Sequence, residues 1–245
     1  MPAGSIFSEW ALSIKRSPFL PVMDEIHEAI SSVAQPGDVL FRLGNAKAFY
    51  IVPFSLLVAG VSKSHYSHAS IIRGKTEIAK DIYDLVIYEV LATGTSIQLL
   101  TEWLINCAGP RIGLFRWRKE YQKLVPEMLA LADRICRAYI PYANRFKLEE
   151  DPVTGLPKSL YCTQFVYYLA KKVGIPIDDA LVKIRDLPAF PLSDKRLIGI
   201  LNSLGISLDQ EIVTVGNEQI GLMASKVLEK VAEWEVRPSK EIVKV

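Results

Sequence analysis

Hydrophobic positions recur with two different periods along this 245-residue chain. Apolar residues at helical spacing predict helices with one buried face over residues 22–34, 124–139 and 162–173. Stretches rich in β-branched and aromatic residues predict strands instead, at residues 39–43, 67–73, 85–93, 96–100 and 111–118. We expect these five strands to form one antiparallel sheet.

The pattern changes beyond Gly174, where three prolines follow within a short distance. Helix-like segments then recur near residues 194–204 and 218–234. These features divide the chain into three parts, namely an N-terminal helical extension (1–35), a core (36–176) and a C-terminal helical appendage or lid (177–245).

The composition limits which cellular compartment and which classes of partner we expect. Half of the residues are hydrophobic, the mean hydropathy is +0.20 and the net charge is only +2, so no strong field favours nucleic acid as a partner. The three cysteines, an odd number at wide spacings, argue against a disulfide framework and a structural zinc site. We expect no metal or other cofactor. The N-terminal residues lack the pattern of a secretory signal, so we expect a cytoplasmic protein.

One apolar run raises the question of a membrane. Residues 48–61 are apolar apart from Ser55, but a membrane span needs about 20 residues. The run is either a core helix or an apolar flap at a binding groove. The basic, aromatic stretch FRWRK (115–119) has two readings as well, contact with anionic lipid or a charged edge strand that blocks aggregation. Peripheral membrane contact therefore stays open, whereas a transmembrane segment is not expected.

Cys162 is the first candidate for chemistry, because it falls in the first turn of the helix predicted from residue 162. Unpaired N–H groups and the helix dipole stabilise a thiolate there. A thiol is mostly protonated at neutral pH, so it needs a base, and the chain has only three histidines. Among these, His27 lies on the polar side of its helix, where we expect it to be solvated, and His65 precedes a strand at the expected entrance to the site.

His68 and Glu89 are the remaining members of a candidate site. Strand alternation places His68 and Ser70 on one face, and Glu89 falls on a largely apolar face of the next long strand. A buried carboxylate needs a partner, which His68 can supply. Cys162, His68 and Glu89 then form a nucleophile, a base and an orienting acid. The alternative is a satisfied core histidine, a strand-end charge and a small buried thiol, and Cys107 and Cys136 are most simply core residues.

At these residues the chain resembles the circularly permuted papain-like amidases of the NlpC superfamily, the YiiX-like group. The resemblance spans roughly residues 36–176, and its specific signal is the order of the motifs, in which histidine and glutamate precede cysteine. Five segments carry it: PGDVLF (36–41), SHASII (67–72), VIYEVLATG (86–94), PYANRF (141–146) and LYCTQFVYYLAKKVGI (160–175).

The resemblance implies an α+β, papain-like, circularly permuted fold. In it the cysteine helix packs on a curved antiparallel sheet of about five strands, with extra N- and C-terminal helices. The family's nucleophile falls on Cys162, its base on His68 and its acid on Glu89. Tyr161 falls on the aromatic residue that helps to shape the oxyanion site, and the Cys162 N–H would be the other donor. We assign three more residues to the substrate side of the site: Thr163, where relatives often have serine, His65 and Tyr142.

The function that follows is a cysteine hydrolase that cleaves an amide, peptide, ester or thioester through an acyl-enzyme. Its substrate would be a small molecule, a peptide or a lipid-linked compound. One alternative is a non-catalytic module that sequesters a lipid or acylated peptide, and another is an N-acyltransferase of the lecithin retinol acyltransferase type. Geometry separates the first alternative from an enzyme, because a catalytic thiol must lie within hydrogen-bond reach of a His68 ring nitrogen.

Overall fold

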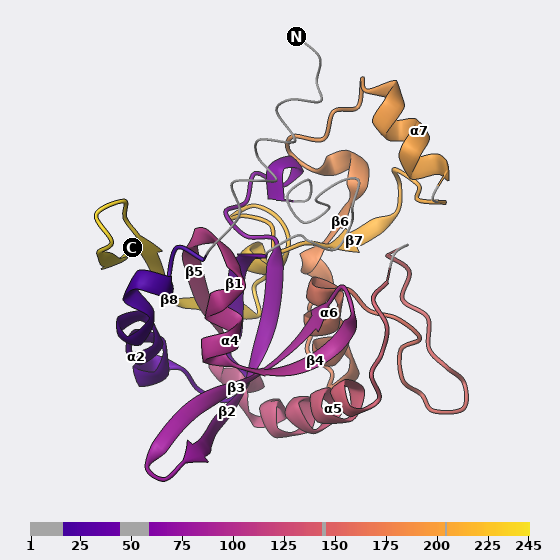
Figure 1. Cartoon of the computed structure of the whole chain (residues 1–245). Coiled ribbons are helices and arrows are strands. Elements are labelled where there is room, and N and C mark those ends of the chain that lie inside the picture. The colour runs from indigo at the N-terminus through magenta and orange to yellow at the C-terminus, as the bar shows by residue number, and fades with distance from the viewer. Residues whose placement is uncertain (1–16, 45–58, 144–145, 204) are drawn as a thin grey trace.

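The computed structural model describes residues 17–44, 59–143, 146–203 and 205–245 (Figure 1). Its α-helices are α2 (Met23–Val33), α4 (Leu100–Ile105), α5 (Val125–Arg137), α6 (Cys162–Lys172) and α7 (Lys195–Ser203). Its strands are β1 (Val39–Gly44), β2 (His68–Ala79), β3 (Ile82–Leu91), β4 (Gly94–Leu99), β5 (Cys107–Trp117), β6 (Leu181–Lys183), β7 (Glu211–Val213), β8 (Leu228–Val236) and β9 (Ile242–Lys244). Short 3-10 helices are η1 (Leu20–Val22), η2 (Lys119–Leu124), η3 (Asp178–Ala180), η4 (Ile184–Asp186) and η5 (Leu222–Ala224).

The α+β expectation is confirmed at the level of a large antiparallel sheet with helices packed on it. The sheet has seven strands in the order β4-β3-β2-β1-β5-β8-β9, and every neighbouring pair is antiparallel. The five expected strands are its β1 to β5. The expected number was too low because β8 and β9 extend the sheet beyond β5.

Helices cover both faces of the sheet. The apolar stripes of α5 and α6 pack on one face, against side chains such as Phe41, Ile71 and Val90. Helices α2 and α4 pack on the other, against Leu40, Ile72 and Ile87 (Figure 1). Strand alternation therefore sends neighbouring residues of β1, β2 and β3 into two separate cores, which explains why these strands read as apolar on both faces.

The helix expected over residues 218–234 is wrong. Only η5 is helical there, and β8 occupies the second half of the segment. Met223, Val227 and Val231 have helical spacing, but Ala232, Trp234 and Val236 also alternate with glutamates, and this second pattern matches a strand. Pairing with β5 decides between the two patterns, and β5 is far away in the sequence.

The stretch FRWRK is not at an edge of the sheet, as one reading of it assumed. Its first residues belong to β5, which lies between β1 and β8. Arg116 pairs there with Asp38, with 2.7 Å between Nη2 and Oδ2. The charge therefore serves an ion pair within the fold.

A smaller unit lies at the N-terminal end of α6. Strands β6 and β7 pair with each other, and α7 lies beside them (Figure 1). Apolar residues of this unit, including Val182, Leu201 and Ile212, pack with Tyr161 and Phe146 in a third cluster. The expected helix at residues 194–204 is α7, so the segment after residue 176 contributes both this unit and two strands of the main sheet.

Candidate active site

Cys162 is the first residue of α6, as its sequence position predicted. Tyr161 precedes it in an extended conformation, and the thiol is only 8% exposed. The sulfur lies against the backbone of β2, where Sγ donates to the Ser67 carbonyl at 3.7 Å and the Ala69 backbone helps to lower the pKa of the thiol. The ladder between β2 and β3 begins one residue further on, at Ser70. The start of β2 therefore offers its backbone to the thiol.

The sheet brings His68 and Glu89 together. Glu89 lies directly opposite Ser70 in the β2–β3 register, so His68 is its diagonal neighbour on the same face. His68 Nε2 donates to Glu89 Oε2 at 2.5 Å. The imidazole also interacts with the Cys162 thiol, and each of these two groups shifts the pKa of the other. The structure thus brings the three predicted residues together in one site.

The pKa values of Cys162 and His68 are shifted in opposite directions. Burial alone would raise the pKa of the Cys162 thiol, but the neighbouring His68 and two backbone N–H groups lower it below its ordinary value. Burial alone would lower the pKa of His68, but the Cys162 thiolate and Glu89 raise it. Both shifts favour the thiolate–imidazolium pair, which is the nucleophilic form of such a site.

Arg42, which the sequence analysis did not single out, completes the site from β1. It lies directly opposite His68 in the β1–β2 register, and its Nη2 is 3.0 Å from Glu89 Oε2. The guanidinium stacks on the Trp103 ring at 4.5 Å and donates through Nη1 to the Trp103 carbonyl. The sequence does contain a signal for Arg42, because an arginine inside the apolar strand VLFRL needs a buried anion as much as Glu89 needs a cation.

Ser70 and Trp103 support the same carboxylate. The Trp103 indole donates to Ser70 Oγ at 2.8 Å, and Ser70 Oγ donates to Glu89 Oε2 at 3.3 Å. Oε2 of Glu89 thus accepts from three side chains, whereas Oε1 has no hydrogen-bond partner among the described residues. The pKa of Glu89 lies below its ordinary value, since Arg42 and His68 outweigh the effect of burial. The carboxylate is ionised and held from one side.

The residues assigned to the substrate side differ in where they point. The Tyr161 hydroxyl accepts the Val213 N–H at 2.8 Å, and Thr163 Oγ1 donates to the Val213 carbonyl at 2.6 Å. Both side chains therefore tie the start of α6 to β7. Tyr142 is half-buried beside the 160–161 segment and feels the charge of the Cys162 thiolate, which together with burial raises the pKa of its phenol.

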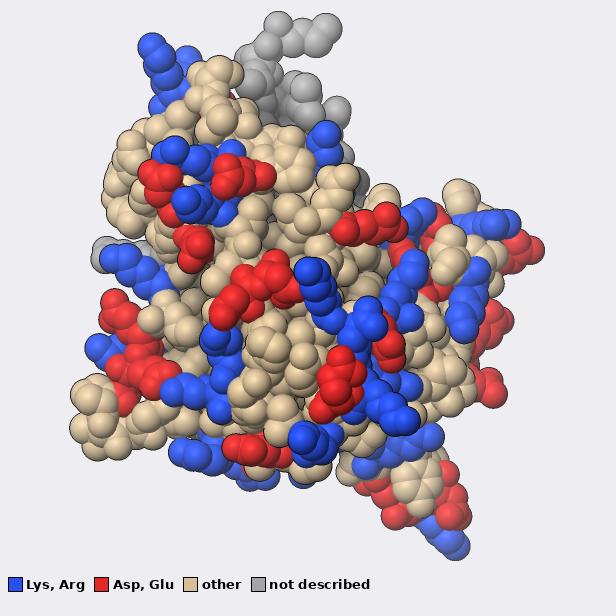
Figure 2. Space-filling model, turned by 180° about the vertical axis from the view of Figure 1, so that it is seen from behind, with Lys and Arg blue, Asp and Glu red and all other residues tan. Residues whose placement is uncertain are grey.

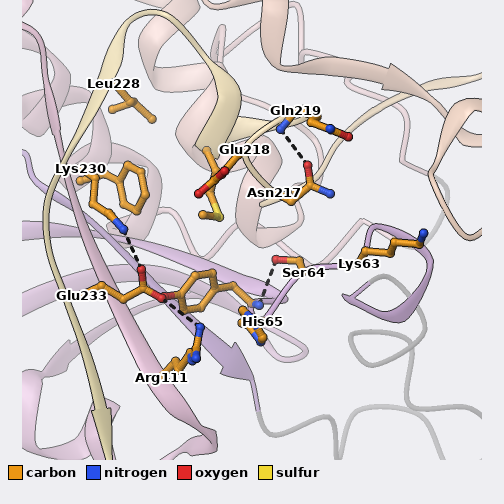
Figure 3. Close-up of a pocket in the computed structure, with 14 residues that line it drawn as sticks. Lys63, Ser64, His65, Arg111, Asn217, Glu218, Gln219, Leu228, Lys230 and Glu233 are labelled. Carbon is orange, nitrogen blue, oxygen red and sulfur yellow. Dashed lines mark hydrogen bonds and ion pairs between the residues drawn. The ribbon is translucent and has the colours of Figure 1, made fainter. Parts of the chain in front are cut away.

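His65 lies in a neighbouring pocket and is exposed. The pocket has a volume of about 590 Å³, and Tyr66, Phe115, Met223 and Leu228 supply its apolar part (Figure 3). Its polar wall centres on Glu233, which accepts from Tyr66 at 2.7 Å and Lys230 at 3.0 Å and lies 3.7 Å from Arg111. Other polar residues of the lining are Lys63, Ser64, Asn217, Glu218 and Gln219. The pocket adjoins the segment that leads into Ser67 and His68.

The other candidate features have separate outcomes. His27 is not simply solvated, because its Nε2 is 2.7 Å from Oδ1 of the buried Asp84. Cys107 and Cys136 are buried, as expected, and burial raises the pKa of each thiol to about 12. The apolar run 48–61 lies outside the described residues except for its last three.

Among residues 17–44, 59–143, 146–203 and 205–245, no group of three or more His, Cys, Asp or Glu side chains is arranged to hold a metal ion. No described helix is long and apolar enough to cross a membrane.

Comparisons with known proteins add a likeness in fold. No family model and no curated protein matches the chain. A crystal structure of the metalloprotein yiiX from Escherichia coli O157:H7 aligns with a TM-score of 0.58, over 81% of this chain and 96% of that one. The two sequences are 15% identical, so the likeness shows a shared fold only. The chemistry has to be argued from the residues of the site.

Proposed function

We propose that the protein is a cysteine hydrolase with a papain-like, circularly permuted active site, in which Cys162 is the nucleophile, His68 the base and Glu89 the orienting acid. One observation carries the proposal. A thiol at the start of a helix interacts with an imidazole that donates a hydrogen bond to a buried carboxylate, and the pKa shifts favour the thiolate–imidazolium pair.

The reaction proceeds in two halves. The Cys162 thiolate attacks the carbonyl carbon of an amide or ester and forms a C–S bond. The His68 imidazolium then gives its proton to the leaving nitrogen or oxygen as the C–N or C–O bond breaks, which leaves a thioester on Cys162. Neutral His68 next takes a proton from water, and the hydroxide attacks the thioester carbonyl. The C–S bond then breaks and the acid leaves, which restores the Cys162 thiolate beside the His68 imidazolium.

Two donors are available for the oxyanion of the tetrahedral intermediate. Cys162 is the first residue of α6, so its N–H has no acceptor within the helix. The Tyr142 phenol lies close enough to the thiolate for that charge to raise its pKa, and it therefore stays protonated and able to donate. We assign the oxyanion to these two groups, because the Tyr161 hydroxyl is bound to β7.

Labelling with a thiol-reactive acyl probe tests the nucleophile. We expect wild-type protein to label at neutral pH at one cysteine, and the Cys162→Ala variant to lose the label. Cys107 and Cys136 serve as internal controls, because buried thiols with pKa values of about 12 do not react under these conditions. Equal labelling of wild type and Cys162→Ala would show that the nucleophile is assigned wrongly. If Cys162→Ala loses the label but wild-type protein turns over no acyl donor, the binding module is favoured.

The neighbouring pocket favours a polar, peptide-like substrate over a lipid chain. Half of its lining residues are charged or carry a side-chain amide, and its apolar part is small. A saturated acyl chain would strip water from Lys230, Arg111 and Glu218 without replacing their hydrogen bonds. Competition separates the two classes: peptide amides should slow labelling of Cys162 at lower concentrations than fatty-acyl amides do, and the reverse order would contradict this substrate class. Mass spectrometry of the products, with and without an added amine, distinguishes hydrolysis from acyl transfer.

A further inference from the structure

A buried cation stands behind the carboxylate of the site. Arg42 is 1% exposed and Glu89 is fully buried, and the two form an ion pair. The guanidinium also donates to the Trp103 carbonyl, and the carboxylate also accepts from His68 and Ser70. The strands β1, β2 and β3 are neighbours in the sheet, so Arg42, His68 and Glu89 come from three adjacent strands and share one face. Hydrogen bonds therefore run from His68 through the Glu89 carboxylate to Arg42 in the core.

We propose that Arg42 is a positioning residue of this active site. It holds the Glu89 carboxylate ionised and in place, so that His68 keeps the protonation state that the reaction requires and faces Cys162. The inference rests on the proposed function. Arg42 touches neither the thiol nor a substrate, and it acts on the reaction only through Glu89 and His68.

Stability alone does not account for a charged pair at this position. Removing two charges from water costs several kcal/mol each, and apolar side chains of similar volume are often at least as stabilising. The other residues of β1 around Arg42, such as Leu40 and Phe41, are apolar and fully buried. An apolar residue would fit this strand equally well, but it would leave Glu89 with only His68 and Ser70.

The direction of the electrostatic effect follows from the sign of the charge. A positive charge favours the deprotonated form of every neighbouring acid, so Arg42 lowers the pKa of both Glu89 and His68. Without it, the last proton of the His68–Glu89 pair leaves at higher pH, because its loss exposes an uncompensated buried carboxylate. The Cys162 thiol also loses its proton at higher pH, because less positive charge then stabilises the thiolate. The whole pH range of the thiolate–imidazolium form therefore moves upward.

The rate of alkylation of Cys162 by iodoacetamide, measured against pH, tests this without a substrate. In wild type we expect two steps, one where the thiolate–imidazolium pair forms and one where the imidazolium loses its proton. In Arg42→Gln both steps should move up by about one pH unit, the size of effect that a close opposite charge has. Arg42→Lys keeps the charge and should keep the wild-type steps, while the poorer fit of its ammonium lowers the rate.

Two further variants complete the design. Arg116→Gln removes another arginine ion pair of the sheet, the one with Asp38, and should leave both steps in place. If Arg42→Gln does not fold, Arg42→Gln/Glu89→Gln removes both charges together, and Cys162 should then titrate as an ordinary thiol without the lower step. Unshifted steps in Arg42→Gln, or a wild-type lower step in the double variant, would overturn the role of Arg42. A wild-type profile with one ordinary thiol step would instead refute the proposed function itself.

Discussion

At the scale of single residues, Glu89 is the member of the site with the least freedom. It is fully buried, and three donors converge on one of its oxygens, one from β1 and two from β2. Such a carboxylate serves two purposes at once. It neutralises Arg42 and a protonated His68, and it fixes the plane of the imidazole that faces the thiol.

The Glu89→Gln variant separates this charge from its shape. The amide keeps the size of the side chain but leaves Arg42 as an uncompensated buried cation, so unfolding in urea should show a loss of about 3 kcal/mol. The imidazolium loses its counter-ion, the thiolate becomes less favourable, and alkylation of Cys162 at neutral pH should slow by at least about tenfold. Ser70→Ala is the matched control, because it removes one hydrogen bond to the same oxygen and leaves all charges. If Glu89→Gln behaved like Ser70→Ala, the charge would have no role.

The sequence was sufficient to find three of the residues in this network and insufficient for the others. Cys162, His68 and Glu89 follow from a helix start and from strand alternation, and the structure brings them together. Arg42 obeys the same rule as Glu89, that a charge in an apolar strand needs a partner, but the rule does not say which partner when several strands are near. Trp103 could not be found, because α4 is a short helix with no capping signal in its sequence before it.

At the scale of elements, the start of α6 is held from the side by β7. Thr163 and Tyr161 each bind the backbone of Val213, one at its carbonyl and the other at its N–H. These contacts come from a part of the chain far from α6 in sequence, and they fix where the first turn, and with it the thiol, lies against β2.

Thr163→Val tests this anchoring. Valine keeps the shape of the side chain and leaves the Val213 carbonyl without its donor, which should lower the free energy of unfolding by about 1–2 kcal/mol. The pH steps of Cys162 alkylation should stay in place, because the thiol, His68 and Glu89 keep their contacts. Thr163→Ser retains the hydroxyl and should recover most of the stability. A shifted pH step in Thr163→Val would mean that this residue contributes to the chemistry directly.

Elements with a strong local pattern were predictable, and those defined by distant pairing were not. The helices α2, α5 and α6 and the strands β1 to β5 lie where apolar periodicity placed them, within a few residues at their ends. In contrast, β8 carries a mixed pattern and is a strand because it pairs with β5 over more than a hundred residues of chain. The length of β2 has the same cause, since residues beyond 73 pair with β3 in a hairpin.

At the scale of the whole molecule, charges of both signs are interspersed over the face that Figure 2 presents. Figure 2 shows Lys and Arg beside Asp and Glu across the face it presents, without a large region of one sign. This agrees with the net charge of only +2. Such a surface has no long-range field to steer a polyanion, so recognition of a substrate must rely on local contacts near the site.

One of these local contacts joins β8 to the segment before β2 and has a predictable effect on stability. Buried Glu233 accepts a hydrogen bond from Tyr66 and another from Lys230, and these lower its pKa below the ordinary value of 4.5 although burial alone would raise it. A carboxyl whose pKa is lower in the folded state stabilises the fold fully at pH values above its unfolded pKa. That stabilisation disappears as the pH falls through the folded pKa.

The Glu233→Gln variant should therefore be less stable than wild type at neutral pH, and the difference between the two should shrink on acidification below about pH 4.5, where the unfolded carboxyl begins to bind its proton. Urea unfolding at a series of pH values from about 7 to 3 measures the difference, and because the other acidic groups titrate alike in both proteins, they cancel. Glu229→Gln, on the exposed side of the same strand, is the control and should change little at any pH. A stability difference that stays constant with pH would show that Glu233 acts through packing alone, and one that grows on acidification would mean that the folded state raises its pKa. Since Glu233 lines the pocket that also includes Tyr66, the same variant also reports whether loosening β8 from the segment before β2 alters the alkylation of Cys162.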